Sequence, residues 1–203
     1  MPKLMIIIGS TRPGRAALPI SRWFFDWAQA HGEFDVTLVD LAKLDLPLVD
    51  EPDLPGLRQY SQQHTREWSA IVEQADAVVI VTPEYNFGYP AAVKNALDYL
   101  HHEWRYKPVG FVSYGGVAAG TRAVQQLKQV VTTLRMLPVF ESVNIPWHPQ
   151  FLTDGTFRPN EPLEQAADAM LAELVRTEKA LRSLRNQGRP VSSHSNGTAM
   201  TKS

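Results

Sequence analysis

The residues near the amino terminus whose types best suit chemistry form one short loop, Gly9-Ser10-Thr11-Arg12-Pro13-Gly14-Arg15. If a helix follows, the backbone N–H groups of this loop can bind an anion, because they meet the positive end of the helix dipole. The side chains of Ser10 and Thr11 add hydroxyl donors. Those of Arg12 and Arg15 can each form paired hydrogen bonds with a phosphate. The loop therefore predicts a site for a terminal phosphate that is held and not cleaved.

Two better-known phosphate loops do not fit this segment. Gly9 and Gly14 have the G-x-x-x-x-G spacing of a nucleoside triphosphate loop. However, Arg15 stands where that loop needs lysine, and Ala16 stands where it needs a hydroxyl to hold magnesium. Thr11 occupies the second glycine position of the dinucleotide pattern G-x-G-x-x-G, so a Rossmann-type NAD site is not expected either. The arginines could also be solvated surface charges, but their place at the mouth of a buried strand favours phosphate binding.

Two further segments of polar and small residues follow buried strands. The segment Pro83-Glu84-Tyr85-Asn86-Phe87-Gly88-Tyr89-Pro90 comes after the β-branched block at 76–82, and its last proline opens a helix. Ser113-Tyr114-Gly115-Gly116 ends another apolar stretch, at 108–114. The carboxyl ends of parallel strands are where open α/β sheets bind ligands. All three loops are therefore expected to form one ligand site at one edge of a sheet.

Alternating strands and helices can position these loops. Strands are predicted at 4–8, 35–40, 76–82, 108–114 and 138–145, and helices at 18–28, 57–74, 91–100, 121–134 and from 161 onward. Residues 41–56 and 147–159 are expected to be irregular. The alternation indicates an α/β protein with a doubly wound, five-stranded parallel sheet in the order 2-1-3-4-5, with helices on both faces.

Composition limits the classes of protein that this chain can represent. Its 203 residues, 44% of them apolar, fit one compact domain, which we expect at 1–186, followed by a disordered polar tail at 187–203. The formal net charge of -1 gives no electrostatic reason to expect nucleic acid or an anionic membrane as partner. Cysteine is absent, so disulfides and thiol redox centres are excluded and redox chemistry needs a bound cofactor. The first apolar run is too short for a signal peptide or a membrane span, which favours a cytoplasmic protein.

Three motifs in this order, each at the end of a predicted strand, resemble the NADPH-dependent FMN reductase family, whose fold is flavodoxin-like. They are Gly9-Ser10-x-Arg12-x-x-Arg15, Pro83-Glu84-Tyr85-Asn86 and Ser113-Tyr114-Gly115-Gly116, and the resemblance covers about 4–134, including 90–98. It implies a homodimer or dimer of dimers with one FMN per subunit. Hydride would pass from NADPH (or NADH) to the flavin and then to a small-molecule acceptor, such as a quinone, an azo dye, free flavin or a metal oxyanion.

The resemblance and the residue chemistry assign the same cofactor-binding roles. Ser10, Arg12 and Arg15 would hold the FMN phosphate, and backbone donors of the second loop would meet the pyrimidine edge of the flavin ring. The glycines of the third loop would let it approach the ring closely. The predicted contacts in these two loops are Pro83, Glu84, Tyr85, Asn86, Phe87, Ser113, Tyr114, Gly115 and Gly116. Many family members carry a small polar residue just after the arginine loop, where this chain has Ala16 and Ala17, so fewer side chains would contact the phosphate.

No catalytic side chain is predicted, because hydride transfer through a flavin needs no acid or base from the protein. No metal site is predicted at His101-His102-Glu103, since adjacent histidines on a helix point in different directions. Ser10 lacks the G-x-S-x-G elbow of a hydrolase nucleophile. The aromatic side chains of Trp104, Tyr106 and Trp147 could line the open face of the flavin, from this subunit or from a neighbouring one.

Two other functions stay open at this point. One is a flavodoxin-like FMN electron carrier without efficient NAD(P)H turnover. Such carriers usually have a strongly acidic surface and hold the phosphate with serine and threonine, whereas this chain is nearly neutral and has two arginines in its loop. The other is a flavin-free binding or regulatory module on the same fold. No residue pattern indicates the acceptor or a preference for NADPH over NADH.

Overall fold

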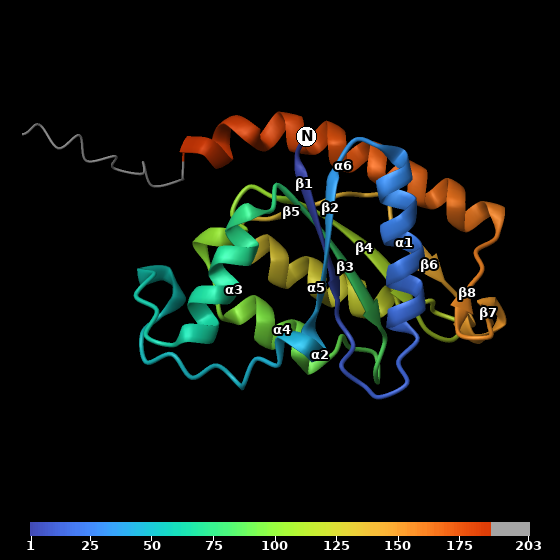
Figure 1. Ribbon diagram of the computed structural model, residues 1–203, viewed down its shortest axis with the longest axis horizontal. Helices are drawn as coiled ribbons and strands as arrows, with labels where there is room; N and C mark the ends of the chain where they lie inside the picture. The colour runs from blue at the N-terminus through green and yellow to red at the C-terminus, as the bar shows by residue number, and fades with distance from the viewer. Residues whose placement is uncertain (188–203) are drawn as a thin grey trace, which may run out of the picture.

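The computed structural model of the chain describes residues 1–187, and a parallel sheet lies at its centre (Figure 1). The sheet runs in the order β2-β1-β3-β4-β5, and the short strand β6 also pairs with β4. The bounds are β1 Lys3–Ile8, β2 Asp35–Asp40, β3 Ala77–Pro83, β4 Pro108–Tyr114, β5 Leu137–Pro138 and β6 Val143–Ile145. All of these pairings are parallel. The predicted strand order 2-1-3-4-5 is therefore confirmed.

Helices cover both faces of the sheet, as predicted (Figure 1). The bounds are α1 Ala17–His31 and α6 Glu161–Gln187 on one face, and α3 Gln63–Gln74, α4 Ala91–Asp98 and α5 Thr121–Thr133 on the other. In β1, Leu4, Ile6 and Ile8 pack toward α1, whereas Met5 and Ile7 pack toward α3. A strand buried on both faces needs apolar side chains at every position, which explains the continuous apolar runs in the sequence.

The fifth strand differs from the prediction because it is interrupted. One strand was expected over 138–145, but β5 and β6 pair separately with β4. Val109 pairs with Pro138 and Val112 with Val143, so the fifth strand has two extra residues between these pairs. Proline has no N–H to donate, which favours the end of a ladder at this point. Because β6 runs beside the second half of β4, the residues after β6 reach the same edge as the loop after β4.

The connection from β2 to α3 is more ordered than predicted, and α3 is shorter. The connection contains α2 at Leu41–Leu44 and a 3-10 turn, η1, at Pro55–Leu57, and α3 begins at residue 63 and not at 57. The carboxylate of Glu51 accepts hydrogen bonds from the N–H groups of Ser61 (2.8 Å) and Gln62 (3.0 Å). An acidic side chain that accepts hydrogen bonds at a helix N-terminus stabilises that end. Helical periodicity could not indicate this cap, because the capping residue, Glu51, lies ten residues before Ser61 in the connection.

The predicted loop at 147–159 also contains regular structure. It holds a 3-10 turn, η3, at His148–Phe151, and a small hairpin of β7 at Leu152–Thr153 and β8 at Thr156–Phe157. The hairpin reverses at Asp154 and Gly155, whose φ angles are 49° and 74°. The hairpin packs against α1, because the ring centroids of Phe157 and Trp23 lie 5.0 Å apart.

The last described element is α6, which ends at Gln187, so the rest of the predicted tail lies outside the described residues. No helix among residues 1–187 is long and apolar enough to cross a membrane. In the same part of the chain, no group of three or more His, Cys, Asp or Glu side chains is placed to hold a metal ion.

Candidate functional site

The carboxyl edge of the sheet contains a cavity of about 920 Å³. The loops after β1, β3 and β4 meet here because the strand order reverses between β1 and β3. Figure 1 shows the loops after β1 and β3 close together at this end of the strands. The start of α1 and the segment after β6 complete the walls. The predicted site residues that line the cavity are Arg12, Arg15, Pro83, Glu84, Tyr85, Tyr114, Gly115 and Gly116.

The loop after β1 is fixed at its first residue by close packing. Gly9 donates its N–H to the carbonyl of Val81 on β3 at 2.9 Å, and a Cβ on this glycine would lie only 2.8 Å from that oxygen. Glycine is therefore required here. The next residue, Ser10, is fully buried, and its hydroxyl forms a 2.8 Å hydrogen bond with the phenol of Tyr85. Ser10 thus joins the first two loops from behind the cavity wall and does not lie at its open surface.

The N-terminus of α1 suits an anionic group. No side chain caps this helix end, and its first turn carries no acidic residue. Arg15, just before it, forms a 2.6 Å ion pair with Asp40, and the two side chains are only 12% and 8% exposed. The Nε of Arg15 is buried without a hydrogen-bond partner among the described residues, and Arg12 is exposed at the cavity. Uncapped helix amides and two guanidinium groups fit a terminal phosphate.

The second loop closes into a tight turn after Tyr85. Its backbone exchanges two hydrogen bonds with Gly88, at 2.8 and 2.9 Å. The two residues between them, Asn86 and Phe87, have φ angles of 50° and 71°, which is a conformation that only a few side chains adopt without strain. Both side chains are exposed and neither lines the cavity. Of the three predicted contacts Tyr85, Asn86 and Phe87, only Tyr85 lines it. The Phe87 ring instead lies against Arg122, whose guanidinium carbon is 4.1 Å from the ring centroid.

Glu84 and Ser113 hold the loops in place. The carboxylate of Glu84 accepts hydrogen bonds from the side chain (2.7 Å) and the backbone N–H (3.2 Å) of Arg122, near the start of α5. The backbone N–H of Glu84 donates to the carbonyl of Tyr114 at 3.1 Å, which joins the second loop to the third. Ser113 is fully buried, and its hydroxyl lies 2.8 Å from the carbonyl of Ala119. Ser113 does not line the cavity, so its position supports the third loop from below.

Tyr114 lines the cavity with a neutral phenol. Burial, followed by the effect of the neighbouring Tyr85, raises the pKa of Tyr114, although hydrogen bonds to Ser10 and to the backbone of Ala17 oppose the rise. A phenol with a raised pKa stays protonated at neutral pH. Tyr114 can therefore act as a hydrogen-bonding group at the wall between α1 and the third loop, but it adds no charge.

The segment after β6 contributes residues that the sequence-based site did not include. Trp147 donates its N–H to Gly116 (3.2 Å), and His148 donates its N–H to Gly115 (3.4 Å), so this segment lies directly against the third loop. A Cβ on Gly115 would lie 3.2 Å from the N atom of Gly120, so close packing favours a glycine at that position. The other cavity residues absent from the predicted site are Gly14, Ala16, Leu18, Pro19, Arg22, Trp147, His148, Pro149, Leu152 and Gly155. Trp147 was suggested from the sequence as an aromatic residue for the flavin face, whereas His148 could have been indicated only by the position of the fifth strand beside the fourth.

Two of the three aromatic residues suggested for the flavin face are elsewhere. Trp104 is fully buried in the short turn η2, His102–Trp104, where its indole donates to the carbonyl of Leu97 at 3.1 Å. Tyr106 lies just before β4, at the amino end of the sheet. Neither residue lines the cavity of its own chain, because the segment before a parallel strand must return to the opposite edge from the ligand site. The suggestion is wrong for Trp104, which is fully buried, and stays a prediction for Tyr106 of a neighbouring subunit. Trp147, after β6, does line the cavity.

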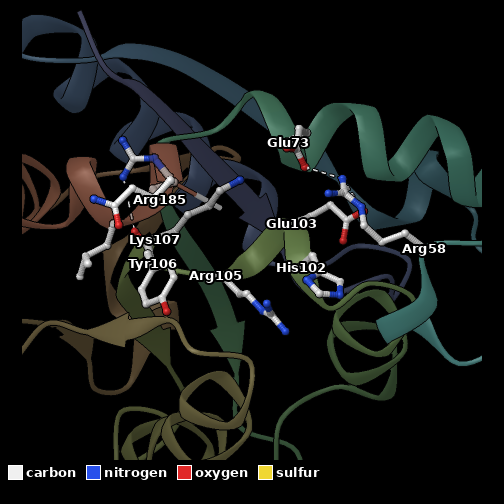
Figure 2. A pocket seen from close by; sticks show the side chains of 10 residues that line it. Arg58, Glu73, His102, Glu103, Arg105, Tyr106, Lys107 and Arg185 are labelled. Atoms are coloured by element: carbon white, nitrogen blue, oxygen red, sulfur yellow. Dashed lines mark hydrogen bonds and ion pairs between the residues drawn. The ribbon is translucent and has the colours of Figure 1, made fainter. Parts of the chain in front are cut away.

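A smaller cavity, of about 250 Å³, lies at that opposite edge (Figure 2). Figure 2 shows the guanidinium group of Arg58 directed toward the carboxylates of Glu73 and Glu103. Arg58 lies 3.0 Å from Glu73 and 3.3 Å from Glu103. Arg185 forms a hydrogen bond with Glu178 at 2.5 Å. Arg185 also lies 3.1 Å from Asp76, just before β3, and this pair fastens α6 to the amino end of the sheet. Because Glu73 and Glu103 at this cavity already pair with Arg58, we take the larger cavity as the candidate site.

Comparisons with known proteins agree with the geometry of the larger cavity. A model of the family described as NADPH-dependent FMN reductase matches residues 2–149. An NAD(P)H-dependent FMN reductase of Schizosaccharomyces pombe is 43% identical over 149 residues, which are 71% of this chain and 74% of that protein. An FMN-dependent NADPH-azoreductase of Staphylococcus saprophyticus is 26% identical over 85% of this chain and 93% of its own length.

A solved structure supports the fold. The flavoenzyme NAD(P)H:(acceptor) oxidoreductase of Paracoccus denitrificans superposes with a TM-score of 0.71 at 21% identity, over 89% of this chain and 98% of that one. The family match spans all three loops of the cavity and the strands that carry them. This chain belongs to the NADPH-dependent FMN reductase family.

Proposed function

We propose that the cavity at the carboxyl edge binds FMN and that the protein uses it to transfer hydride from NAD(P)H to a small acceptor. The observation that carries this proposal is the combination of an uncapped α1 N-terminus, two arginines and a 920 Å³ cavity at the switch point of the sheet. Family membership supports the same activity. The cofactor would supply the redox chemistry, since the chain has no cysteine to form a thiol redox centre and hydride transfer is cofactor chemistry.

The chain's own residues bind and orient the flavin in this proposal. Arg12 and the amides of α1 hold the phosphate, and Arg15 adds its unpartnered Nε while Asp40 fixes its position. The loops after β3 and β4 form the two sides of the ring site, and the hydrogen bond from Glu84 to Tyr114 keeps their spacing. Preorganised backbone donors at the pyrimidine edge would stabilise the negative charge that reduction places there.

Asn86, Phe87 and Ser113 are proposed to support the site without contacting the flavin. Asn86 and Phe87 shape the turn that aims the backbone of the second loop, and Ser113 carries the third loop. No side chain is needed as an acid or base for hydride transfer. The donor and the acceptor would use the same open side of the cavity in turn, which is consistent with acceptance of several small oxidants such as quinones and azo compounds.

The test is cofactor binding followed by turnover. The purified protein, loaded with FMN, should contain close to one flavin per chain and should oxidise NADPH or NADH steadily when a quinone or an azo compound is added. A protein that binds FMN but turns over neither donor with any acceptor would be an electron carrier. A protein that neither binds FMN nor gains thermal stability from it would be a flavin-free module.

The assembly and the location of the protein stay predictions. A homodimer or dimer of dimers is implied by the family resemblance, and exposed apolar side chains on the β2–α3 connection offer a contact surface. Leu48, Leu54 and Leu57 are 81%, 76% and 58% exposed. Light scattering on the FMN-loaded protein should give twice or four times the mass of the chain. Cell fractionation would test the predicted cytoplasmic location.

A further inference from the structure

The cavity extends beyond the three loops assigned to FMN. Its volume of about 920 Å³ is near the upper end of the roughly 300–1,000 Å³ that single small-molecule sites occupy. Past the start of α1, it continues toward the β7–β8 hairpin, where its walls include Leu18, Arg22, Trp147 and Leu152. This outer part combines apolar side chains, one cation and one large aromatic ring.

Arg22 is separated from the phosphate loop along α1. It lies five residues after Ala17, the first residue of α1, which corresponds to about 7.5 Å of rise along the helix axis. Arg12 and Arg15 lie in the loop before α1, so Arg22 is the arginine that α1 itself contributes to the cavity wall. Arg22 is exposed, and among the described residues no carboxylate lies within ion-pair distance of it. The cavity wall therefore carries one arginine on α1 in addition to the two in the loop, although FMN carries only one phosphate.

Trp147 is held at the cavity mouth by its backbone. Its φ angle is 46°, in the left-handed region that bulky residues rarely adopt. The hydrogen bond from its N–H to Gly116 helps to keep this conformation, and the side chain remains 59% exposed. A large aromatic residue kept exposed by an unfavourable backbone conformation suggests a functional role. The indole offers a flat surface on which a planar ring can stack.

We propose that this outer part of the cavity binds the nicotinamide dinucleotide, with Arg22 contacting one of its phosphates and Trp147 stacking on one of its rings. The inference rests on the proposed function, because it assumes that FMN occupies the inner part. Arginine matches phosphate oxygens with paired, charge-assisted hydrogen bonds. The pyrophosphate is common to NADPH and NADH, whereas only NADPH has a 2′-phosphate, so the two donors report which phosphate Arg22 contacts.

Calorimetric titration of the FMN-loaded protein with tetrahydro-NADPH and tetrahydro-NADH, which cannot donate hydride, tests the proposal. Arg22→Gln should weaken binding of tetrahydro-NADPH about tenfold or more, while FMN affinity and thermal stability stay unchanged. If Arg22→Gln binds both analogues more weakly, Arg22 contacts the pyrophosphate. If it binds only tetrahydro-NADPH more weakly, Arg22 contacts the 2′-phosphate. Arg176→Gln is the matched control, because Arg176 is an arginine on α6 with an 82% exposed side chain.

The stacking role of Trp147 is tested in the same titration. Trp147→Ala should weaken both analogues severalfold, and Trp147→Phe should restore most of the affinity because it keeps an aromatic face. Unchanged affinity in Arg22→Gln and Trp147→Ala would overturn the proposal, even if the wild-type protein oxidises NADPH normally. A parallel loss of FMN affinity in Arg22→Gln would also overturn it, since Arg22 would then serve the flavin phosphate. Failure of the wild type to bind FMN would instead reject the proposed function.

Discussion

Breaking the ion pair between Arg15 and Asp40 should cost the flavin-free protein about 3 kcal/mol of unfolding free energy. Removing one partner of a buried pair typically costs about 3–5 kcal/mol, because the other charge stays buried without compensation. These side chains lie 2.6 Å apart and are 12% and 8% exposed. After Arg15→Met, Asp40 would keep the hydrogen bond from the N–H of Ala42 at 3.1 Å, so the lower end of the range is expected.

Urea and thermal denaturation of the flavin-free protein at pH 7 measure this cost. A loss of about 3 kcal/mol should lower the melting temperature by about 6–12 °C in a domain of this size. The double variant Arg15→Met/Asp40→Asn removes both charges and should recover most of the loss, since a neutral pair needs no compensation. A loss below about 1 kcal/mol in Arg15→Met, or no recovery in the double variant, would refute the reasoning.

Single variants of Arg15 and Asp40 also distinguish an effect on folding from an effect on FMN binding. Asp40→Asn leaves the cation of Arg15 in place without its carboxylate partner, so the positive potential at the phosphate site should rise. This variant should therefore bind FMN at least as tightly as the wild type, whereas Arg15→Met should bind it more weakly. Fluorescence titration with FMN, under conditions in which both variants are folded, gives the comparison. Weaker binding in Asp40→Asn would mean that the geometry of Arg15 matters more than its charge.

Two further predictions concern the frame of the site. Gly120→Ala should lower the unfolding free energy, measured by urea denaturation, by more than about 1 kcal/mol. The φ angle of Gly120 is +83°, and a new Cβ would lie 2.9 Å from the Cβ of Ser113. Gly155→Ala is the control for backbone strain alone, because Gly155 has a φ angle of +74° and no atom within 4 Å of the new Cβ. Glu51→Ala should cost about 1 kcal/mol at pH 7 through loss of the α3 cap. Burial opposes the shift, but hydrogen bonds from Gln62 and Ser61 lower the pKa of Glu51 from 4.5 to about 2. Its stabilisation is therefore complete above pH 4.5 and is lost as the pH falls toward 2, so the two stability curves should converge over that interval.

Strands and the ligand edge could be predicted because their signals are local. The runs at 35–40 and 108–114 are rich in apolar and β-branched residues, and the structure gives β2 and β4 these same bounds. The three loops then follow from topology, since parallel strands place the segments after them at one edge. For this reason the residues at the cavity wall, such as Arg12 and Gly115, were within reach of sequence analysis.

The remaining features depend on packing between distant segments. The side chains of Asn86 and Phe87 leave the cavity because positive φ angles turn that loop. Asparagine adopts positive φ more readily than most residues, but phenylalanine does not, so the residue types gave only a partial signal. Trp104 is buried because α3 brings Trp68 against it, with ring centroids 5.8 Å apart. Arg22 reaches the cavity because the β7–β8 hairpin packs beside α1. Such contacts between elements cannot be read from periodicity.

The central claim is that the cavity holds FMN with its phosphate at the loop after β1. The most direct measurement compares the dissociation constants of FMN and riboflavin, which differ only in the phosphate, for the wild type and for Arg12→Gln. Charge-assisted hydrogen bonds worth about 1.5–3 kcal/mol predict that the wild type prefers FMN about 10–100-fold. Arg12→Gln should reduce this preference about tenfold and leave riboflavin affinity unchanged, because Arg12 is exposed in the loop. Equal affinity of the wild type for the two flavins, or an unchanged preference in Arg12→Gln, would contradict the account.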